Sequence, residues 1–272
     1  PEHGSQYGEY ALAGGLKGRP LPVVSGPVTE LPISATAEIA IEGHIHPGTT
    51  RSEGPFGEWD GYYATAMGYY GPETDEVPVL DVEAVYHREN PILSCAVPAK
   101  PPYDYSLHKS VMRSATLWNQ LEDAGVPNVE GVWRTEVGGS RLFNVVSISQ
   151  RYAGHARQAG YVATQTRAGA YNGRWTVVVD DDIDPTDLKE VTWAMATRCD
   201  PARDIEFIER AWTSGDDTLV EEGQTPMNSR AIVDATVPYE RRESFPDVAD
   251  ASPEFQADIR EKWGEVITGS PE

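Results

Sequence analysis

Residues 53–58 hold two carboxylates in a constrained bend. Glu53 and Glu58 flank the sequence Gly-Pro-Phe-Gly, in which two glycines and a proline leave the backbone a nearly fixed path. A loop with little backbone entropy left to lose holds its acids in place, as acid–base chemistry requires. A carboxylate enclosed with aromatic side chains can have a raised pKa and act as a general acid. The bend therefore predicts an acid–base site, and an idle, solvent-exposed pair of glutamates is the alternative.

A second constellation precedes this bend. Glu42, His44 and His46 alternate with isoleucines over residues 37–46, which is the pattern of a strand with one apolar face and one polar face. The apolar face is predicted to be buried. Two imidazoles and a carboxylate on the polar face are a candidate site for a transition metal, and polar filling of that face is the alternative.

Two further sets of polar residues are predicted to have structural roles. Asp180–Asp182 end an apolar strand, where open α/β sheets often bind ligands, but a capping and turn role before the next helix is favoured. In that role Asp184 is predicted to cap the helix and Pro185 to take its first position. His155 is also interpreted as structural. The sequence has no Gly-x-Ser-x-Gly, phosphate-loop or Gly-x-Gly-x-x-Gly motif.

The first hundred residues predict a β-rich unit. Residues 9–18 fit either a short helix or an irregular strand that ends at glycines. Pro47 and Gly48 are predicted to end the strand that carries the histidines. The predicted strands are 21–24, 28–33, 37–46, 77–86 and 92–97.

The pattern changes after the proline-rich stretch 98–102. Apolar residues then recur at helical spacing, and Trp175–Val179 form a continuous apolar run of the kind buried on both faces of a sheet. The chain is therefore predicted to be of mixed α+β class, with two domains. The predicted elements are helices 104–124, 153–166, 185–197 and 253–267, strands 129–133, 142–149, 175–179 and 205–210, and a polar loop at 215–230.

The composition and net charge of the chain exclude some classes of function. The 272 residues carry a formal net charge of −21, which repels phosphate backbones and anionic lipid surfaces, so nucleic acid is not an expected partner. No apolar run approaches the roughly 20 residues that span a bilayer, and no signal peptide is visible. Two cysteines, Cys95 and Cys199, make no disulfide framework, which favours a reducing compartment and a cytoplasmic location.

Five stretches in order resemble the UbiD family of prenylated-flavin decarboxylases. They are AEIAIEG at 37–43, EGPFGEWDGYY at 53–63, SQRYAGHARQAG at 149–160, VVVDDDIDPTDLKEVTWAMATRCDPARD at 177–204 and AIVDAT at 231–236. The resemblance implies that residues 1–103 are the remainder of a split β-barrel that binds prenylated FMN. It further implies an α/β C-terminal domain at 104–245, and a connector with a terminal helix at 246–272.

The resemblance also implies roles for four residues. Glu58 takes the position of the acid that protonates the substrate carbon after carbon dioxide leaves, and Glu53 belongs to the same network. Glu9 matches a glutamate that helps a divalent ion, Mn²⁺ or Mg²⁺, to hold the cofactor phosphate, and K⁺ is a further candidate ion. Arg167 aligns with a lysine that reaches this phosphate. An arginine of the catalytic network and two metal ligands of the family, an asparagine and a histidine, match no residue after Pro1.

The resulting hypothesis is a reversible, non-oxidative decarboxylase of an α,β-unsaturated or (hetero)aromatic carboxylic acid. A flavin prenyltransferase is the implied supplier of the cofactor, and homo-oligomers are usual in the family. Two alternatives stay open at this stage. The chain could be an incomplete or non-catalytic subunit that needs an N-terminal partner chain, or a metal enzyme built on Glu42, His44 and His46.

Overall fold

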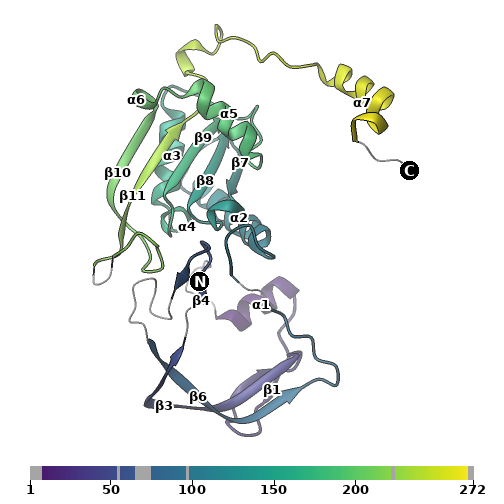
Figure 1. Ribbon diagram of the computed structural model, residues 1–272, viewed down its shortest axis with the longest axis vertical. Helices are drawn as coiled ribbons and strands as arrows, with labels where there is room; N and C mark the ends of the chain where they lie inside the picture. The colour runs from purple at the N-terminus through teal and green to yellow at the C-terminus, as the bar shows by residue number, and fades with distance from the viewer. Residues whose placement is uncertain (1–7, 54–55, 65–74, 96–97, 222–223, 269–272) are drawn as a thin grey trace. The chain divides into compact units, whose positions relative to one another are not determined.

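The computed structural model describes residues 8–53, 56–64, 75–95, 98–221 and 224–268 (Figure 1). Packing divides the chain into two units, Pro1–Thr236 and Val237–Glu272, which are described separately. The second unit contains a short 3-10 helix, Tyr239–Arg241, and the helix α7, Pro253–Thr268. The first unit contains every other element, and its mixed helices and sheets confirm the predicted α+β class.

A five-stranded sheet organises the larger part of the first unit (Figure 1). Its strand order is β10-β11-β9-β8-β7, with β8, β9 and β11 parallel and the two edge strands antiparallel to their neighbours. The strands are β7 (Val129–Arg134), β8 (Phe143–Ile148), β9 (Trp175–Asp180), β10 (Ile205–Trp212) and β11 (Met227–Asp234).

Helices cover both faces of this sheet. Alternation along β9 sends Val178 into the core with α2 and α3, while Val177 and Val179 enter the core with α5. All three valines are fully buried, so the prediction of a strand buried on both faces is confirmed. The helices are α2 (Ser106–Asp123), α3 (His155–Gln165), α4 (Arg167–Ala170), α5 (Leu188–Arg198) and α6 (Pro201–Asp204).

Residues 8–95 form smaller elements. Helix α1 resolves the ambiguity at residues 9–18 in favour of a helix. The strands pair as three two-stranded sheets, β1–β2, β4–β5 and β3–β6, and the described residues close no barrel. The elements are α1 (Glu9–Lys17), β1 (Val23–Ser25), β2 (Pro32–Ser34), β3 (Ile39–Glu53), β4 (Phe56–Gly57), β5 (Tyr63–Ala64) and β6 (Asp75–His87).

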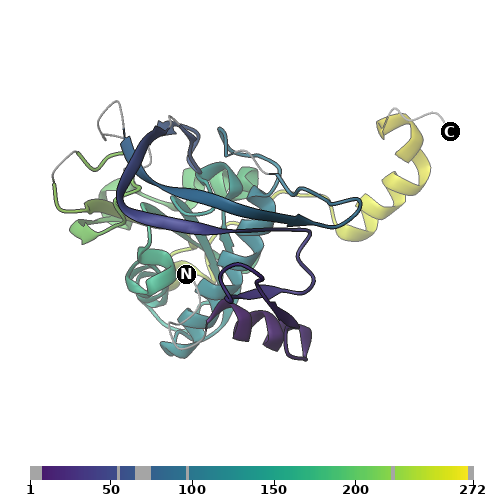
Figure 2. The ribbon, with the colours of Figure 1, turned by 90° about the horizontal axis from the view of Figure 1, so that it is seen from below.

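The long ribbon of β3 and β6 corrects two predictions (Figure 2). The strand does not end at Pro47 and Gly48, because β3 continues to Glu53 through a register shift between Ile45 and Thr50. The isoleucine face is not buried, since Ile41 is 53% exposed. A two-stranded ribbon covers neither of its faces unless another element packs on it.

Three local predictions were also wrong. Asp187 rather than Asp184 caps α5, because its carboxylate accepts the Lys189 N–H at 2.8 Å. Residues 92–95 form no strand, and 96–97 lie outside the described residues. The predicted polar loop at 215–230 contains the start of β11, because pairing with β10 extends the strand into a polar stretch. Across the described ranges, no helix has the length and apolar character that crossing a membrane requires.

Close packing of α3 on the sheet gives a stability prediction. A methyl group added at Gly160 would lie 2.4 Å from the Ile232 Cγ2 atom, so Gly160→Ala forces α3 or Ile232 to shift. Overpacking costs about 1–3 kcal/mol, which exceeds the gain of roughly 1 kcal/mol that alanine brings to a helix. We expect urea unfolding to show a lower free energy of unfolding for this variant.

Gly15→Ala is the matched control, because that helical glycine has no atom within 4 Å of the added methyl group. The control should unfold at the same or a higher urea concentration than the wild type. A Gly160→Ala variant as stable as the wild type would contradict the packing of α3 described above.

Candidate functional site

Glu58 lies at the tip of the β4–β5 hairpin. Its N–H donates to the Tyr62 carbonyl at 2.8 Å, and its own carbonyl accepts the Gly61 N–H at 3.0 Å. The Asp60 carboxylate accepts the Tyr62 N–H and so tightens the same turn. The Glu58 side chain is half-buried, so a fixed hairpin tip presents it as the bend predicted.

Glu53 ends β3 and is exposed. Residues 54–55, which link it to the hairpin, lie outside the described residues. In the part of the chain that the structure describes, no hydrogen bond joins the Glu53 and Glu58 carboxylates. The predicted sharing of one network by the two acids therefore stays a prediction.

The residue after Glu58 anchors the hairpin. Trp59 is 3% exposed, and the Arg141 guanidinium lies 4.4 Å from the centre of its ring. The backbone of Gly139, at φ +64°, passes so close that a Cβ there would lie 2.5 Å from the Trp59 ring. A side chain at that position would both strain the backbone and displace the indole. Trp59 thus fits only against a glycine.

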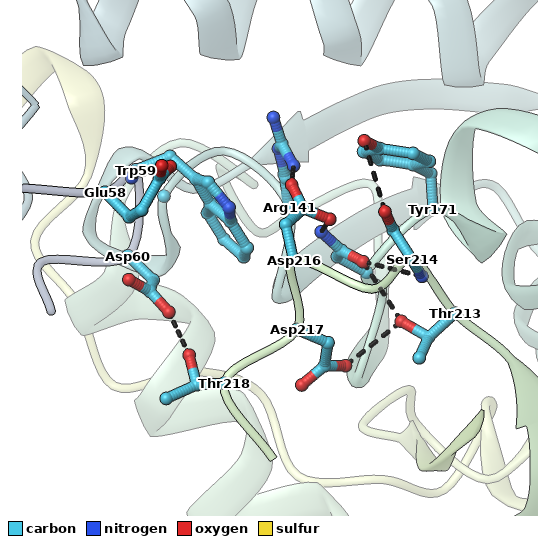
Figure 3. A network of polar contacts seen from close by, with 12 residues as sticks. Glu58, Trp59, Asp60, Arg141, Tyr171, Thr213, Ser214, Asp216, Asp217 and Thr218 are labelled. Carbon is cyan, nitrogen blue, oxygen red and sulfur yellow. Dashed lines mark hydrogen bonds and ion pairs between the residues drawn. The ribbon is translucent and has the colours of Figure 1, made fainter. Parts of the chain in front are cut away.

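Arg141 belongs to a polar network with the loop after β10 (Figure 3). Its Nη1 donates to Asp216 Oδ2 at 2.6 Å, and the Tyr171 ring lies 4.9 Å from its other side. Asn172 donates to the second oxygen of Asp216 at 2.9 Å. Thr218 donates to Asp60, so the same loop also bonds to the Glu58 hairpin.

The charge of Asp216 is stabilised in this network. Burial would raise the pKa of its carboxyl, but hydrogen bonds from Asn172 and Ser214 and the Arg141 guanidinium together lower that pKa. Asp217, beside it, is buried and pairs with Arg174 while accepting a hydrogen bond from Thr213. The loop at 213–218 is therefore held by two arginine–aspartate pairs.

Four arginines line a pocket of about 220 Å³ next to this network. Arg134 is buried and donates to three backbone carbonyls and to Asn144, so its role is structural. Arg167 is exposed and stacks on Trp212 at 4.9 Å, and no carboxylate among the described residues pairs with it. The lining residues are Arg113, Thr116, Arg134, Arg141, Arg167, Ala168 and Tyr171.

Tyr103 lies within electrostatic range of Glu58 and of two arginines of this pocket. Burial and Tyr105 raise the pKa of its phenol, the charges of Arg113 and Arg141 lower it, and the charge of Glu58 raises it. Its ring meets that of Tyr105 edge-on at 5.3 Å. An acid, a phenol and two guanidiniums therefore lie within electrostatic reach of one another, an arrangement suited to binding an anionic ligand beside a proton donor.

Glu9 is exposed in the first turn of α1. In the described ranges, no hydrogen bond or ion pair joins its carboxylate to Arg167 or to Glu58. Those ranges also contain no cluster of three histidine, cysteine, aspartate or glutamate side chains that could hold a metal ion. Glu9 alone is one hard oxygen donor, fewer than a divalent ion requires.

The candidate transition-metal site on β3 is not formed, and that interpretation was wrong. Glu42 is buried and accepts hydrogen bonds from the Thr29 hydroxyl and from the Thr29 N–H. These bonds, the one from the hydroxyl most of all, lower the pKa of the Glu42 carboxyl. His44 pairs with Glu83 at 2.5 Å and His46 with Asp81 at 3.5 Å across the ribbon. Each of the three side chains points to its own partner.

The other polar groups have structural roles, but Asp180 and Asp182 act through ion pairs rather than as the predicted caps. The buried Arg198 bonds to Asp182 at 2.8 Å and pairs with Asp180 at 3.4 Å, so these acids fix α5 to the end of β9. His155 is fully buried at the start of α3 against the Tyr152 ring. Burial lowers its pKa, which favours the neutral imidazole.

Sequence reasoning missed much of this site. Arg141, Asp216 and Tyr103 come from three separate loops, and no local spacing pointed to them. Arg113 lies on α2, where its position among apolar residues was the only available signal.

Comparisons with known proteins locate the chain among carboxy-lyases. The family model of the 3-octaprenyl-4-hydroxybenzoate carboxy-lyase Rift-related domain matches residues 3–101, and that of the C-terminal domain matches residues 107–235. An uncharacterized protein of Archaeoglobus fulgidus is 32% identical over 270 residues, which cover 95% of this chain and 52% of the relative. A phenolic acid decarboxylase of Bacillus subtilis is 30% identical over 232 residues, which cover 85% of this chain and 46% of the relative.

Among solved structures, the UbiD-class enzyme HmfF from Pelotomaculum thermopropionicum in complex with FMN is 31% identical, with a TM-score of 0.77. The match covers 94% of this chain and 55% of that one. An evolved dimeric form of HmfF with prFMN is 30% identical, with a TM-score of 0.72 over 94% of this chain and 52% of that one. The chain thus spans about half the length of the curated relatives it matches.

The lowered pKa of Asp216 predicts an acid-dependent loss of stability. A carboxylate whose pKa is lower in the folded state stabilises fully above its unfolded pKa, about 3.9, and the stabilisation is lost as pH falls through the folded value. Asp216→Asn should therefore lower the free energy of unfolding most near neutral pH, with a gap to the wild type that narrows below about pH 4.

Denaturant unfolding at a series of pH values measures this gap. Asp181→Asn removes the same charge at an exposed position and serves as the control, with a gap that stays small throughout. A gap for Asp216→Asn that is unchanged between neutral and acid pH would contradict the assigned charge interactions.

Proposed function

Because the chain belongs to the UbiD family, we propose that it forms part of a reversible, non-oxidative decarboxylase that uses prenylated FMN. The proposed substrate is an α,β-unsaturated or (hetero)aromatic carboxylic acid. The observation that carries the proposal is the Glu58 hairpin, which holds a half-buried acid next to Trp59, and the Trp59 ring lies against Arg141 of the arginine-lined pocket. The names of the relatives, which include a phenolic acid decarboxylase, support the reaction class.

The arginine pocket fits the phosphate of a flavin cofactor. Arg167 is exposed and lines the pocket together with Arg113 and Arg141. Arg141 is bonded to Asp216, whereas no carboxylate among the described residues pairs with Arg167, so Arg167 is the arginine available to a phosphate. Arg167 would bind the phosphate, in the role that the family resemblance implies for a lysine. HmfF, the similar solved structure, is in complex with FMN in one form and with prFMN in another.

The protein's own part in the reaction is orientation and proton delivery. Prenylated FMN, when bound, supplies the electrophile that accepts the electrons of the C–C bond as carbon dioxide leaves. Glu58 would then donate a proton from its carboxyl to the substrate carbon that lost the carboxylate. The hairpin, anchored by the buried Trp59, would present this carboxyl from a defined place.

The metal and ion roles need donors from outside the described residues. Glu9 fits the role of one ligand to Mn²⁺ or Mg²⁺, and we retain it as a proposal together with K⁺. No step of the proposed mechanism depends on either ion.

We also propose that further sequence completes the cofactor domain. The β3–β6 ribbon exposes one apolar face, with Ile45 61% and Val82 53% exposed, which a split β-barrel would cover. The remaining half of the relatives' length could supply this cover, either in the same polypeptide or as an N-terminal partner chain. We propose in addition that the protein forms a homo-oligomer in the cytoplasm and that a separate flavin prenyltransferase supplies its cofactor. If the cover is missing, the chain is an incomplete, non-catalytic subunit.

Glu58→Gln tests the proton donor. The amide preserves the shape of the side chain but cannot supply the proton, so turnover should fall by at least about 100-fold while folding and flavin binding persist. Carbon dioxide release from a panel of unsaturated and aromatic acids measures turnover in the full-length gene product. Glu89→Gln, an exposed glutamate, is the control. Full activity in Glu58→Gln would end this assignment.

Arg167→Ala tests the phosphate site. Loss of a charged hydrogen bond should raise the dissociation constant of the flavin by about 10- to 100-fold, whereas Arg203→Ala, at an exposed arginine paired with Asp200, should not. Glu9→Ala should likewise lose flavin first. The measurement is the native mass and the ultraviolet–visible spectrum of protein made alongside a flavin prenyltransferase. A full-length protein that never binds flavin would refute the proposed function.

A further inference from the structure

The hairpin that carries Glu58 is fixed to the α/β domain through its neighbours. Among the described residues, the only hydrogen bond to the Glu58 carboxylate is a long one, 3.4 Å, from the Trp59 N–H. Trp59 itself is 3% exposed, and Asp60 accepts a bond from Thr218. The placement of the Glu58 hairpin against the α/β domain therefore depends on the contacts of Trp59 and Asp60.

Arg141 holds that ring by stacking. Its guanidinium lies between two aromatic rings, 4.4 Å from the centre of Trp59 and 4.9 Å from that of Tyr171 (Figure 3). A flat guanidinium between two ring faces combines cation–π attraction with close packing, and a lysine ammonium cannot reproduce both. Arg141 is thus the contact between the Glu58 hairpin and the residues that precede β9.

Asp216 fixes the orientation of Arg141. Its Oδ2 accepts from Nη1 at 2.6 Å, and the buried Asn172 holds its other oxygen at 2.9 Å. Asn172 has φ +57° and also accepts from Thr213 and from the Ser214 N–H, so the aspartate sits in a loop that is itself bonded. The chain of contacts runs from Asn172 through Asp216 and Arg141 to Trp59.

Resting on the proposed function, we propose that Arg141 is a positioning residue for decarboxylation. Held by Asp216, it fixes the Trp59 indole and thereby the position of the neighbouring Glu58 carboxyl. Its effect falls on proton delivery rather than on binding of substrate or flavin. This role differs from the one proposed for Arg167, whose exposed guanidinium would bind the cofactor phosphate.

The test uses the flavin-loaded, full-length enzyme with Arg141→Gln and Asp216→Asn. Misplacing a reacting group by about 1 Å can cost about 100-fold in rate, so we expect kcat to fall by about 10- to 100-fold. KM should change by less than about threefold, and flavin content should equal that of the wild type, because these interactions act on the transition state. The solvent deuterium isotope effect on kcat should increase, since protonation becomes the slow step.

Arg174→Gln is the matched control. Arg174 pairs with Asp217 in the same loop as Asp216, and among the described residues no hydrogen bond or ring contact joins it to Trp59. A general loosening of the loop would slow Arg174→Gln as much as Arg141→Gln and would overturn the proposal. A loss of flavin from Arg141→Gln like that from Arg167→Ala would also overturn it, since Arg141 would then be a cofactor-binding residue.

A double-mutant cycle tests whether Arg141 acts through the indole. In a Trp59→Leu background, or in Trp59→Phe if the first variant fails to fold, Arg141→Gln should add less than about twofold to the loss in kcat. If the fold losses in kcat from the two single substitutions multiply in the double variant, Arg141 acts independently of Trp59, which contradicts the proposal.

Amide hydrogen exchange separates this inference from the proposed function, because it needs no turnover. Exchange at residues 58–62 should be at least about tenfold faster in Arg141→Gln than in the wild type, and unchanged in Arg174→Gln. A wild-type enzyme without flavin or decarboxylase activity would refute the proposed function alone. Unchanged exchange in Arg141→Gln would refute the positioning role, whatever the activity.

Discussion

Burial of β9 on both faces is the constraint on which the rest of the α/β domain depends. Its valines leave no solvent-exposed side, so helices must pack above and below, and β8 and β11 must lie beside it in parallel. Because β8 and β9 run parallel, the residues that precede them lie at the same end of the sheet, where the parallel strands begin. The loop after β10 reaches the same edge, because β10 is antiparallel to β11. Arg141, Tyr171 and Asp216 meet there for this reason.

This location differs from the usual one in open α/β sheets, where ligands bind at the carboxyl ends of the strands. At that end of β9, Asp180 and Asp182 are taken by the buried Arg198, which closes the edge with ion pairs. The amino-terminal edge is where cationic side chains face an open pocket. Local charge thus opposes the net charge of −21, and since salt screens fields beyond about 8–10 Å, the pocket's own arginines dominate within it.

The sequence predicted the α/β domain well, because buried strands and amphipathic helices have strong periodic patterns. It failed where pairing overrides a local signal: β3 continues past Pro47 and Gly48, and β11 begins in a polar stretch whose buried Arg230 bonds to backbone carbonyls. Glu58 could be found from its motif and its bend. Arg141 and Asp216 could not, since their partners are separated from them by 30 residues or more and only the folded chain brings them together.

The β3–β6 ribbon has a consequence for handling this polypeptide. Among the described residues each of its strands pairs only with the other, so neither outer edge is paired with a further strand there. Long open edges beside exposed isoleucine and valine side chains recruit strands from other molecules. If further sequence completes this domain as proposed, the chain expressed without it is expected to assemble edge to edge into insoluble, sheet-rich aggregates. Whether the expressed chain stays in solution therefore indicates whether the ribbon is paired with further strands.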